Sequence, residues 1–100
     1  MIDLDAKSLK LVKEILIREI PNTEVRAFGS RVNGNAKPFS DLDLVIVSPN
    51  PLNWQQIENV KNQFSESDLP ITVDVINWAT ISENFRKIIE KKYIVIQRQK

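Results

Sequence analysis

The sequence predicts an α+β fold in which helices cover a small mixed β-sheet, with the element order α-β-α-β-α-β-α. Apolar residues recur at helical spacing in three segments, 7–19, 53–65 and 80–93. The segments between them alternate or are largely apolar, as strands are, at 24–28, 40–47 and 71–77. A length of 100 residues suits one small domain, so we expect residues 1–100 to fold as a single unit.

The first helix is predicted from an apolar face that lies opposite lysines and glutamates. That face consists of Leu9, Val12 and Leu16, with Leu11 and Ile15 contributing in part. Pro21-Asn22 should end the helix. The alternation from Glu24 to Phe28 then predicts a short strand that leads into Gly29.

The segment after the first strand is expected to be mostly irregular. Ser30 is a suitable N-cap for a short helix at 30–33. Gly34 and Pro38 mark the loop that follows. The second strand should then end at the proline-rich run 48–51.

The second half should add a helix, a strand and a last helix. Asn53 can cap a helix, and its inward face is predicted from four residues at helical spacing: Trp54, Ile57, Val60 and Phe64. For Trp54, a position in or beside the core is favoured over a base-stacking surface. The residues from Thr80 to Glu83 match a capping box. It should start a last helix through Phe85, Ile88 and Ile89, after which residues 93–97 fit either a helix end or an edge strand.

The composition removes several classes of chemistry. Hydrophobic residues make up 42% and charged residues 27%, as in an ordinary globular protein. There is no cysteine and no histidine, so catalysis would rest on carboxylates, hydroxyls, basic residues and metal. No apolar run approaches the ~20 residues of a membrane span, and the N-terminus lacks the pattern of a signal peptide. We therefore expect a soluble, cytoplasmic protein.

Positive charge is concentrated at the C-terminal end. Residues 86–100 contain six Lys or Arg and one Glu, whereas the whole chain has a net charge of +1. Such a tail could contact a polyanion or an acidic partner. It could equally supply favourable cations at a helix end and a solvated terminus. The second interpretation is preferred, because the tail has few aromatic residues and no dense basic run.

Two aspartates on the second strand are the first candidates for chemistry. Residues two apart on a strand share a face, so Asp41 and Asp43 should point together, away from Leu42, Leu44 and Ile46. Like charges at 4 Å near a protein surface repel by about 4 kcal/mol. A bound cation would relieve this repulsion, and so would a solvated strand edge or a turn capped by aspartate. The pair alone does not decide between these readings.

A glycine-serine turn precedes this pair, and a third aspartate follows it. The backbone amides of a turn at Gly29-Ser30 could hold phosphate. Asp74 lies within an apolar strand, where an aspartate is often paired with a cation or solvated. If its strand neighbours the second strand, Asp74 completes a three-carboxylate cluster with Asp41 and Asp43. The three acids and the turn together favour a functional interpretation, phosphoryl or nucleotidyl transfer.

These residues resemble the signature of the DNA polymerase β nucleotidyltransferase superfamily. The matching positions are Gly29-Ser30-Arg31-Val32-Asn33-Gly34, Ser40-Asp41-Leu42-Asp43-Leu44 and Asp74 in Val-Asp-Val-Ile. Within the superfamily, the short chain is similar to the minimal nucleotidyltransferase (MNT) group. The resemblance covers most of the chain and implies a polymerase-β-like nucleotidyltransferase fold, although a fold alone does not establish activity.

The resemblance also implies a reaction. The family binds a nucleoside triphosphate, here expected to be ATP, with two Mg²⁺ ions, for which Mn²⁺ can substitute. It transfers the nucleoside monophosphate to an acceptor and releases pyrophosphate. By this resemblance Asp41, Asp43 and Asp74 would be the catalytic metal ligands. The nucleotide-binding residues would be Gly29, Ser30, Arg31 and Ser40.

One position departs from the family pattern. Many relatives have Arg or Lys where this chain has Asn33. A cation there could neutralise triphosphate charge. Arg31 or Lys37 could take over that charge, or the nucleotide could bind weakly.

The resemblance further implies a protein partner. MNT proteins are typically paired with small helical HEPN proteins as toxin–antitoxin systems, in which the MNT chain is the antitoxin and adenylylates a tyrosine of the HEPN ribonuclease within a hetero-oligomer. An alternative is a non-catalytic or weakly catalytic MNT-fold module that neutralises or scaffolds a HEPN partner by contact. Transfer to a small molecule such as an aminoglycoside is less favoured. No membrane or direct nucleic-acid contact is expected. Apolar candidates for a partner surface, each better suited to a core, are Trp54, Trp78, Phe85 and Tyr93.

Overall fold

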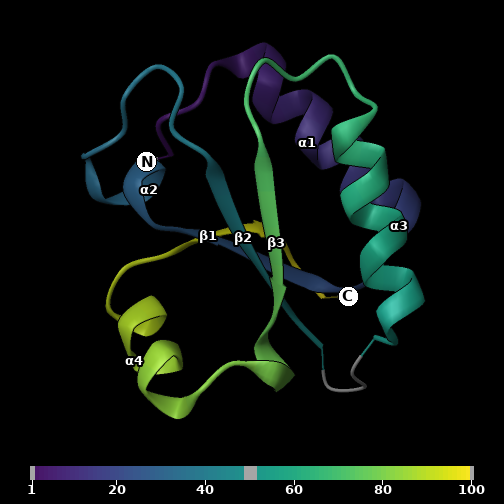
Figure 1. The fold of residues 1–100 in the computed structure, drawn as a ribbon, viewed down its shortest axis with the longest axis vertical. Coiled ribbons are helices and arrows are strands. Elements are labelled where there is room, and N and C mark those ends of the chain that lie inside the picture. Colours follow the sequence, from purple (N-terminus) through teal and green to yellow (C-terminus); the bar gives the residue numbers. More distant parts are fainter. Residues whose placement is uncertain (1, 49–51, 100) are drawn as a thin grey trace.

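The fold is a four-stranded sheet with helices on both faces, seen in a computed structural model that describes residues 2–48 and 52–99 (Figure 1). The proline-rich turn expected after the second strand and Lys100 of the basic tail fall partly or wholly outside the described residues. The elements in order are α1 (Ala6–Glu19), β1 (Glu24–Phe28), α2 (Ser30–Asn33), β2 (Leu42–Val47), α3 (Trp54–Ser65), β3 (Val73–Asn77), a 3₁₀ turn (Trp78–Thr80), α4 (Glu83–Lys91) and β4 (Ile94–Gln97).

The sheet has the strand order β3-β2-β1-β4. Strand β1 runs antiparallel to β2 and β4, whereas β2 and β3 run parallel. The predicted α+β fold with a mixed sheet is therefore confirmed. The segment for which a helix end and an edge strand were both open is the edge strand β4.

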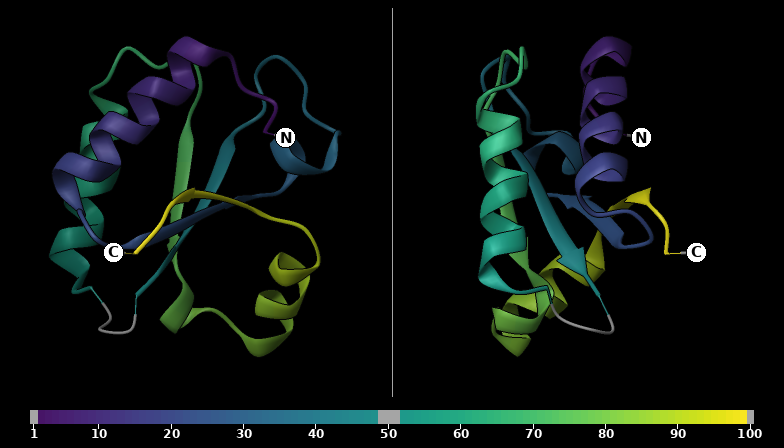
Figure 2. Two further views of the ribbon diagram at one scale, coloured as in Figure 1. Left: turned by 180° about the vertical axis from the view of Figure 1, so that it is seen from behind. Right: turned by 90° about the vertical axis from the view of Figure 1, so that its right-hand side faces the viewer.

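One face of the sheet packs on α1 and α3 and forms the main core (Figure 2). The central strand β2 supplies Leu42, Leu44 and Ile46, each no more than 1% exposed, as its alternation predicted. The helices and the C-cap residue of α1 supply the facing residues, which are Val12, Ile15, Leu16, Ile20, Ile57, Val60 and Phe64. This core fixes β2, and with it the direction in which the aspartates of β2 project.

Hydrogen bonds from side chains cap the N-termini of both core helices, α1 and α3. The Asp5 carboxylate accepts a hydrogen bond from the Ser8 amide at 3.2 Å and caps α1. Asn53 and Gln56 form a reciprocal capping box at the start of α3, with bonds of 2.9 and 3.0 Å. The predicted cap at Asn53 is confirmed.

The other face of the sheet is covered at one end by α4 (Figure 1). The rings of Phe28 on β1 and Phe85 on α4 pack edge to face, with their centroids 5.8 Å apart. The guanidinium of Arg26 lies over the rings of Trp78 and Tyr93, 5.3 and 4.5 Å from their centroids. Aromatic contacts therefore hold α4 to the sheet.

The start of α4 differs from the prediction. The helix begins at Glu83, and its N-cap is Ser82, whose hydroxyl accepts from the Phe85 amide at 3.1 Å. Thr80 instead ends the 3₁₀ turn, and its hydroxyl donates to the Asn77 carbonyl at 3.0 Å. The predicted capping box was wrong because this threonine hydroxyl closes the preceding turn.

Trp54 also differs from the prediction, because it is 74% exposed. It is the first residue of α3, and a helical side chain covers the turn on the N-terminal side of its own Cα. At the first position there is no such turn, so the ring projects past the end of the helix. Within the described residues, no helix is long and apolar enough to span a bilayer.

Two neighbouring isoleucines of α4 test how this helix is anchored. Ile89 is 1% exposed and Ile88 is 62% exposed. We expect Ile89→Ala to lower the free energy of unfolding by about 2–5 kcal/mol, because it removes buried methyl groups and leaves a cavity. Ile88→Ala, the matched control, should change it by less than about 0.5 kcal/mol. Urea unfolding followed by circular dichroism measures both, and equal losses would contradict this packing of α4.

Candidate active site

Three side chains in register, one from each of β3, β2 and β1, cross the sheet on the face that carries α4. Asp43 on β2 has Asp74 on β3 and Phe28 on β1 as its direct neighbours in register. Residues directly opposite each other in neighbouring strands share a face of the sheet. Asp41 lies just before β2, one strand period from Asp43. The structure therefore brings the three predicted acids to the same end of the same face. We call Asp41, Asp43 and Asp74 the acidic row.

These acids have no compensating partner within the described part of the chain. Neither a hydrogen bond nor an ion pair involves the carboxylates of Asp41, Asp43 and Asp74 in residues 2–48 and 52–99. Asp41 and Asp74 are exposed, and Asp43 is half-buried. The interpretation in which Asp74 pairs with a lysine or arginine therefore does not apply.

The electrostatic repulsion among the three acids falls mainly on Asp43. Burial raises the pKa of Asp43, and the negative charges of Asp74 and Asp41 raise it further. A divalent cation would offset both causes, because it replaces lost hydration and neutralises the neighbouring charges. The row is thus chemically suited to a cation that prefers oxygen ligands.

The acids do not form a finished metal cage. Among the described residues, no group of three acidic side chains is arranged closely enough to hold an ion unaided. That Asp41, Asp43 and Asp74 hold metal therefore stays a prediction. An incomplete set still fits Mg²⁺, which usually takes one or two carboxylates together with substrate phosphates and water.

Gly29 brings the predicted phosphate turn directly against Asp43. Its backbone has φ +80° and ψ −155°, a region that only glycine adopts readily. A Cβ at this position would overlap Oδ2 of Asp43 and lie 3.3 Å from its Cγ. The absence of a side chain at Gly29 therefore allows the turn and the carboxylate to touch.

Ser30 is the first residue of α2 and follows this contact. The predicted N-cap at Ser30 was wrong, because Gly29 occupies the cap position and no side chain caps the helix. The Ser30 hydroxyl makes no hydrogen bond to the described residues. Asn33, the departure from the family pattern, is exposed and its side-chain oxygen accepts from the Asn35 amide at 3.1 Å.

Two residues predicted to bind nucleotide are engaged with the protein itself. Arg31 is buried, and its guanidinium donates to backbone carbonyls of Asp3, Lys37, Pro38 and Ser40. The Ser40 hydroxyl accepts from the Lys37 amide at 2.8 Å. Both side chains shape the loop that leads into β2. The residue types alone gave no signal of this role, because the carbonyl acceptors are set by the fold.

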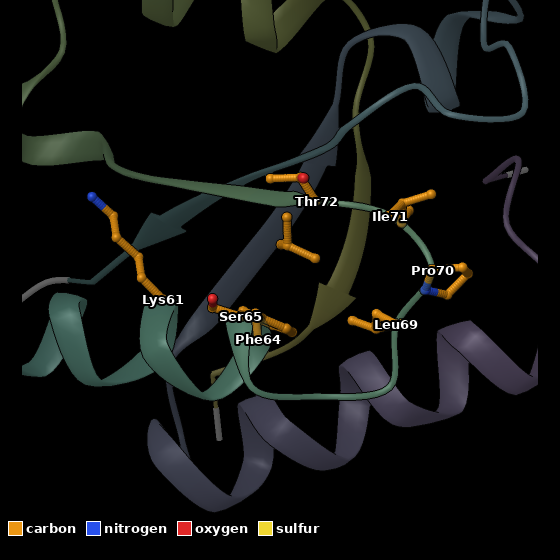
Figure 3. Close-up of a pocket in the computed structure, with 8 residues that line it drawn as sticks. Lys61, Phe64, Ser65, Leu69, Pro70, Ile71 and Thr72 are labelled. Carbon is orange, nitrogen blue, oxygen red and sulfur yellow. The ribbon is translucent and has the colours of Figure 1, made fainter.

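A separate cavity of about 300 Å³ lies between α3 and the segment that leads into β3 (Figure 3). Lys61, Phe64 and Ser65 of α3 line it together with residues 69–73. None of the three aspartates lines it, so it is not the place where the chemistry of the acidic row would occur.

The amino-acid sequence matches a known protein family. Residues 9–97 match the family described as a nucleotidyltransferase domain. The chain is also 51% identical to the probable protein adenylyltransferase MntA of Haemophilus influenzae, over 98% of this chain and 86% of that protein. The chain belongs to the nucleotidyltransferase domain family. The predicted membership in a nucleotidyltransferase family is thereby confirmed.

Solved structures confirm the nucleotidyltransferase fold. A chain of a toxin–antitoxin with AMP-PNP superposes with a TM-score of 0.75 at 18% identity, over 90% of this chain and 73% of that one. A chain of the tri-AMPylated Shewanella oneidensis HEPN toxin in complex with its MNT antitoxin gives 0.68 at 15% identity, over 92% and 71%.

The contact at Gly29 yields a matched pair of variants. Gly29→Ala should lower the free energy of unfolding by about 2–5 kcal/mol, because it adds backbone strain and drives a methyl group into Asp43. Gly34→Ala should cost only about 1–2 kcal/mol, because Gly34 also has a positive φ but has open space around its Cα. Urea unfolding of both variants provides the measurement, and an equal loss would contradict the contact with Asp43.

The raised pKa of Asp43 predicts how stability depends on pH. The folded state holds the Asp43 proton more tightly than the unfolded state, so ionisation of this carboxyl destabilises the fold as pH rises above the ordinary value of 3.8. Without added metal, Asp43→Asn should therefore be more stable than wild type at pH 7, and this difference should shrink as pH falls toward 3.8. Urea unfolding across this pH range measures it. A difference that does not vary with pH would contradict the prediction.

Proposed function

We propose that residues 1–100 act as one Mg²⁺-dependent nucleotidyltransferase domain that transfers AMP from ATP to a tyrosine of a HEPN-family partner, and so serves as the antitoxin of a toxin–antitoxin pair. The family is a nucleotidyltransferase family, and a relative with 51% identity is named as a probable protein adenylyltransferase. The substrate, the metal and the partner are the proposed parts of this function.

One observation carries the proposal: a glycine turn lies in contact with a row of carboxylates that have no partner among residues 2–48 and 52–99. Gly29 touches Asp43, and Asp43 is flanked by Asp74. Unpaired like charges beside a backbone turn would ordinarily be unfavourable, and a metal-bound triphosphate supplies what each side lacks. Its phosphates can accept hydrogen bonds from the turn, while its metal ions offset the carboxylates.

The residues of the site would divide the work as follows. The Ser30 hydroxyl, which has no hydrogen-bond partner among the described residues, lies beside Gly29 and would bind the terminal phosphates. Asp41, Asp43 and Asp74 would hold Mg²⁺, which offsets the charge of the triphosphate and lowers the pKa of the acceptor hydroxyl. The acceptor oxygen bonds to the α-phosphorus, the bond from that phosphorus to the bridging oxygen breaks, and pyrophosphate leaves.

The acceptor should approach from the side of β3. This strand is at the edge of the sheet, and Asp74 on it is exposed. Asp74 is thus within reach of a large acceptor such as a folded protein, and it would take the proton from the acceptor hydroxyl. Arg31 and Ser40 are proposed to shape the loop before β2, and not to contact the nucleotide.

The partner is proposed from the relatives. Structural neighbours are described as toxin–antitoxin pairs, one of them with an AMPylated HEPN toxin. The described surface offers apolar side chains for such a contact, each at least 58% exposed: Ile17, Phe39, Trp54 and Ile88. Trp54 thus moves from the expected core to the candidate partner surface.

The proposal is tested by transfer of label to the partner. Purified chain, the HEPN protein, Mg²⁺ and ATP labelled on the α-phosphate are mixed, and label on the HEPN protein is followed with its position mapped by mass spectrometry. We expect wild type to label a tyrosine. Asp43→Asn and Asp74→Asn should each reduce the rate by about 100-fold or more, because each loses a group expected to hold metal.

The matched control is Asp68→Asn, an aspartate in the loop before β3 that is absent from the acidic row. It should transfer at the wild-type rate. Wild-type activity in Asp43→Asn would remove this residue from the mechanism. A tight complex without any transfer by the wild-type chain would overturn the enzymatic proposal and favour neutralisation by contact.

A further inference from the structure

Arg31 is a buried cation next to the proposed phosphate turn. It follows Ser30 directly and is only 7% exposed. Its Nε donates to the Ser40 carbonyl at 2.9 Å, and its Nη2 donates to the carbonyls of Pro38 at 3.1 Å and Lys37 at 3.4 Å. No carboxylate pairs with it in the described part of the chain. Backbone dipoles therefore compensate its charge.

These bonds join the two halves of the site. Arg31 belongs to α2, which begins at the phosphate turn, and Ser40 immediately precedes Asp41. A single guanidinium thus connects the turn to the loop that delivers Asp41 and Asp43. The planar group offers donors in fixed directions, so it can hold several carbonyls at once in one geometry.

The same residue ties the N-terminal segment to the site. The Asp3 amide donates to the Arg31 carbonyl at 2.6 Å, and Nη1 of Arg31 donates to the Asp3 carbonyl at 2.8 Å. Two residues later, Asp5 caps α1. Arg31 is therefore the meeting point of three segments: α2, the loop at 37–40 that follows it, and the distant N-terminal residues 2–5.

We propose that Arg31 is a positioning residue that sets the separation between the Gly29-Ser30 turn and the Asp41–Asp43 pair. This inference rests on the proposed nucleotidyl transfer for its consequence in catalysis, and its structural part stands apart from it. Because the turn and the acids must act on one triphosphate, their separation matters most as the transition state forms. Loss of the guanidinium should therefore lower kcat more than it raises KM for ATP.

The experiment compares Arg31→Lys and Arg31→Gln with Arg18→Lys, a matched control on α1 whose side chain is 57% exposed. Lysine keeps the charge but cannot reach several carbonyls in the fixed directions of a guanidinium. Transfer to the HEPN protein gives kcat and KM, thermal unfolding reports the fold, and backbone amide NMR reports the positions of the turn and of residues 40–43. We expect both Arg31 variants to remain folded and to lose about tenfold or more in kcat, with KM changed by less than about threefold.

The NMR arm separates this inference from the proposed function. We expect the amide signals of Gly29 and Ser30 and those of residues 40–43 to shift together in both Arg31 variants, and neither group to shift in Arg18→Lys. If wild type transfers no label, the proposed function fails, and the joint shift still supports the positioning role.

Four outcomes would overturn the inference. A raised KM with unchanged kcat would identify Arg31 as a direct nucleotide contact. Unchanged kcat and KM with only a lower unfolding temperature would reduce Arg31 to a structural residue. Failure of both variants to fold would assign Arg31 to the fold as a whole, and amide shifts confined to residues 30–32 would remove the link to the acids.

Discussion

The rest of the fold has to support a concentration of negative charge at one end of the sheet. Asp43 is half-buried between Asp74 and the backbone of Gly29, and no cation of the described chain pairs with it. Burial and like charge both oppose its ionisation, so this arrangement must be maintained by the rest of the fold. The apolar residues on the reverse of β2, buried under α1 and α3, provide that support because they fix the strand and thereby the direction of its acids.

Much of this could be predicted from the sequence because strands have a strict period of two. Asp41 and Asp43 alternate with Leu42, Leu44 and Ile46, so burial of the leucines determined the face on which the acids lie. Asp74 could be added because the residues on both sides of it are apolar valines. Asp74 lies opposite Asp43 because β3 is the parallel neighbour of β2. The sequence allowed this strand order but did not require it.

The remaining features depend on groups that a sequence does not specify. The role of Arg31 arises from backbone carbonyls, which every residue carries, so its neighbours in the sequence gave no sign of it. Thr80 and Ser82 are both good caps, and the 3₁₀ turn decided between them. Trp54 had the right spacing for the core but lies at the first position of its helix. The acids share a face as expected, yet among the described residues no three acidic side chains are arranged to hold a metal ion by themselves.

Phe28 links α4 to the end of the sheet that carries the acids. It is the neighbour of Asp43 in register, it precedes Gly29, and its ring packs on Phe85 of α4. A shift of α4 would therefore act on the strand end that carries both the turn and the residue beside the acid. Arg31 holds the opposite side of the same turn through the loop before β2. The turn is thus held by an aromatic contact and by a guanidinium, which is how a domain of this size can keep such an arrangement rigid on short elements.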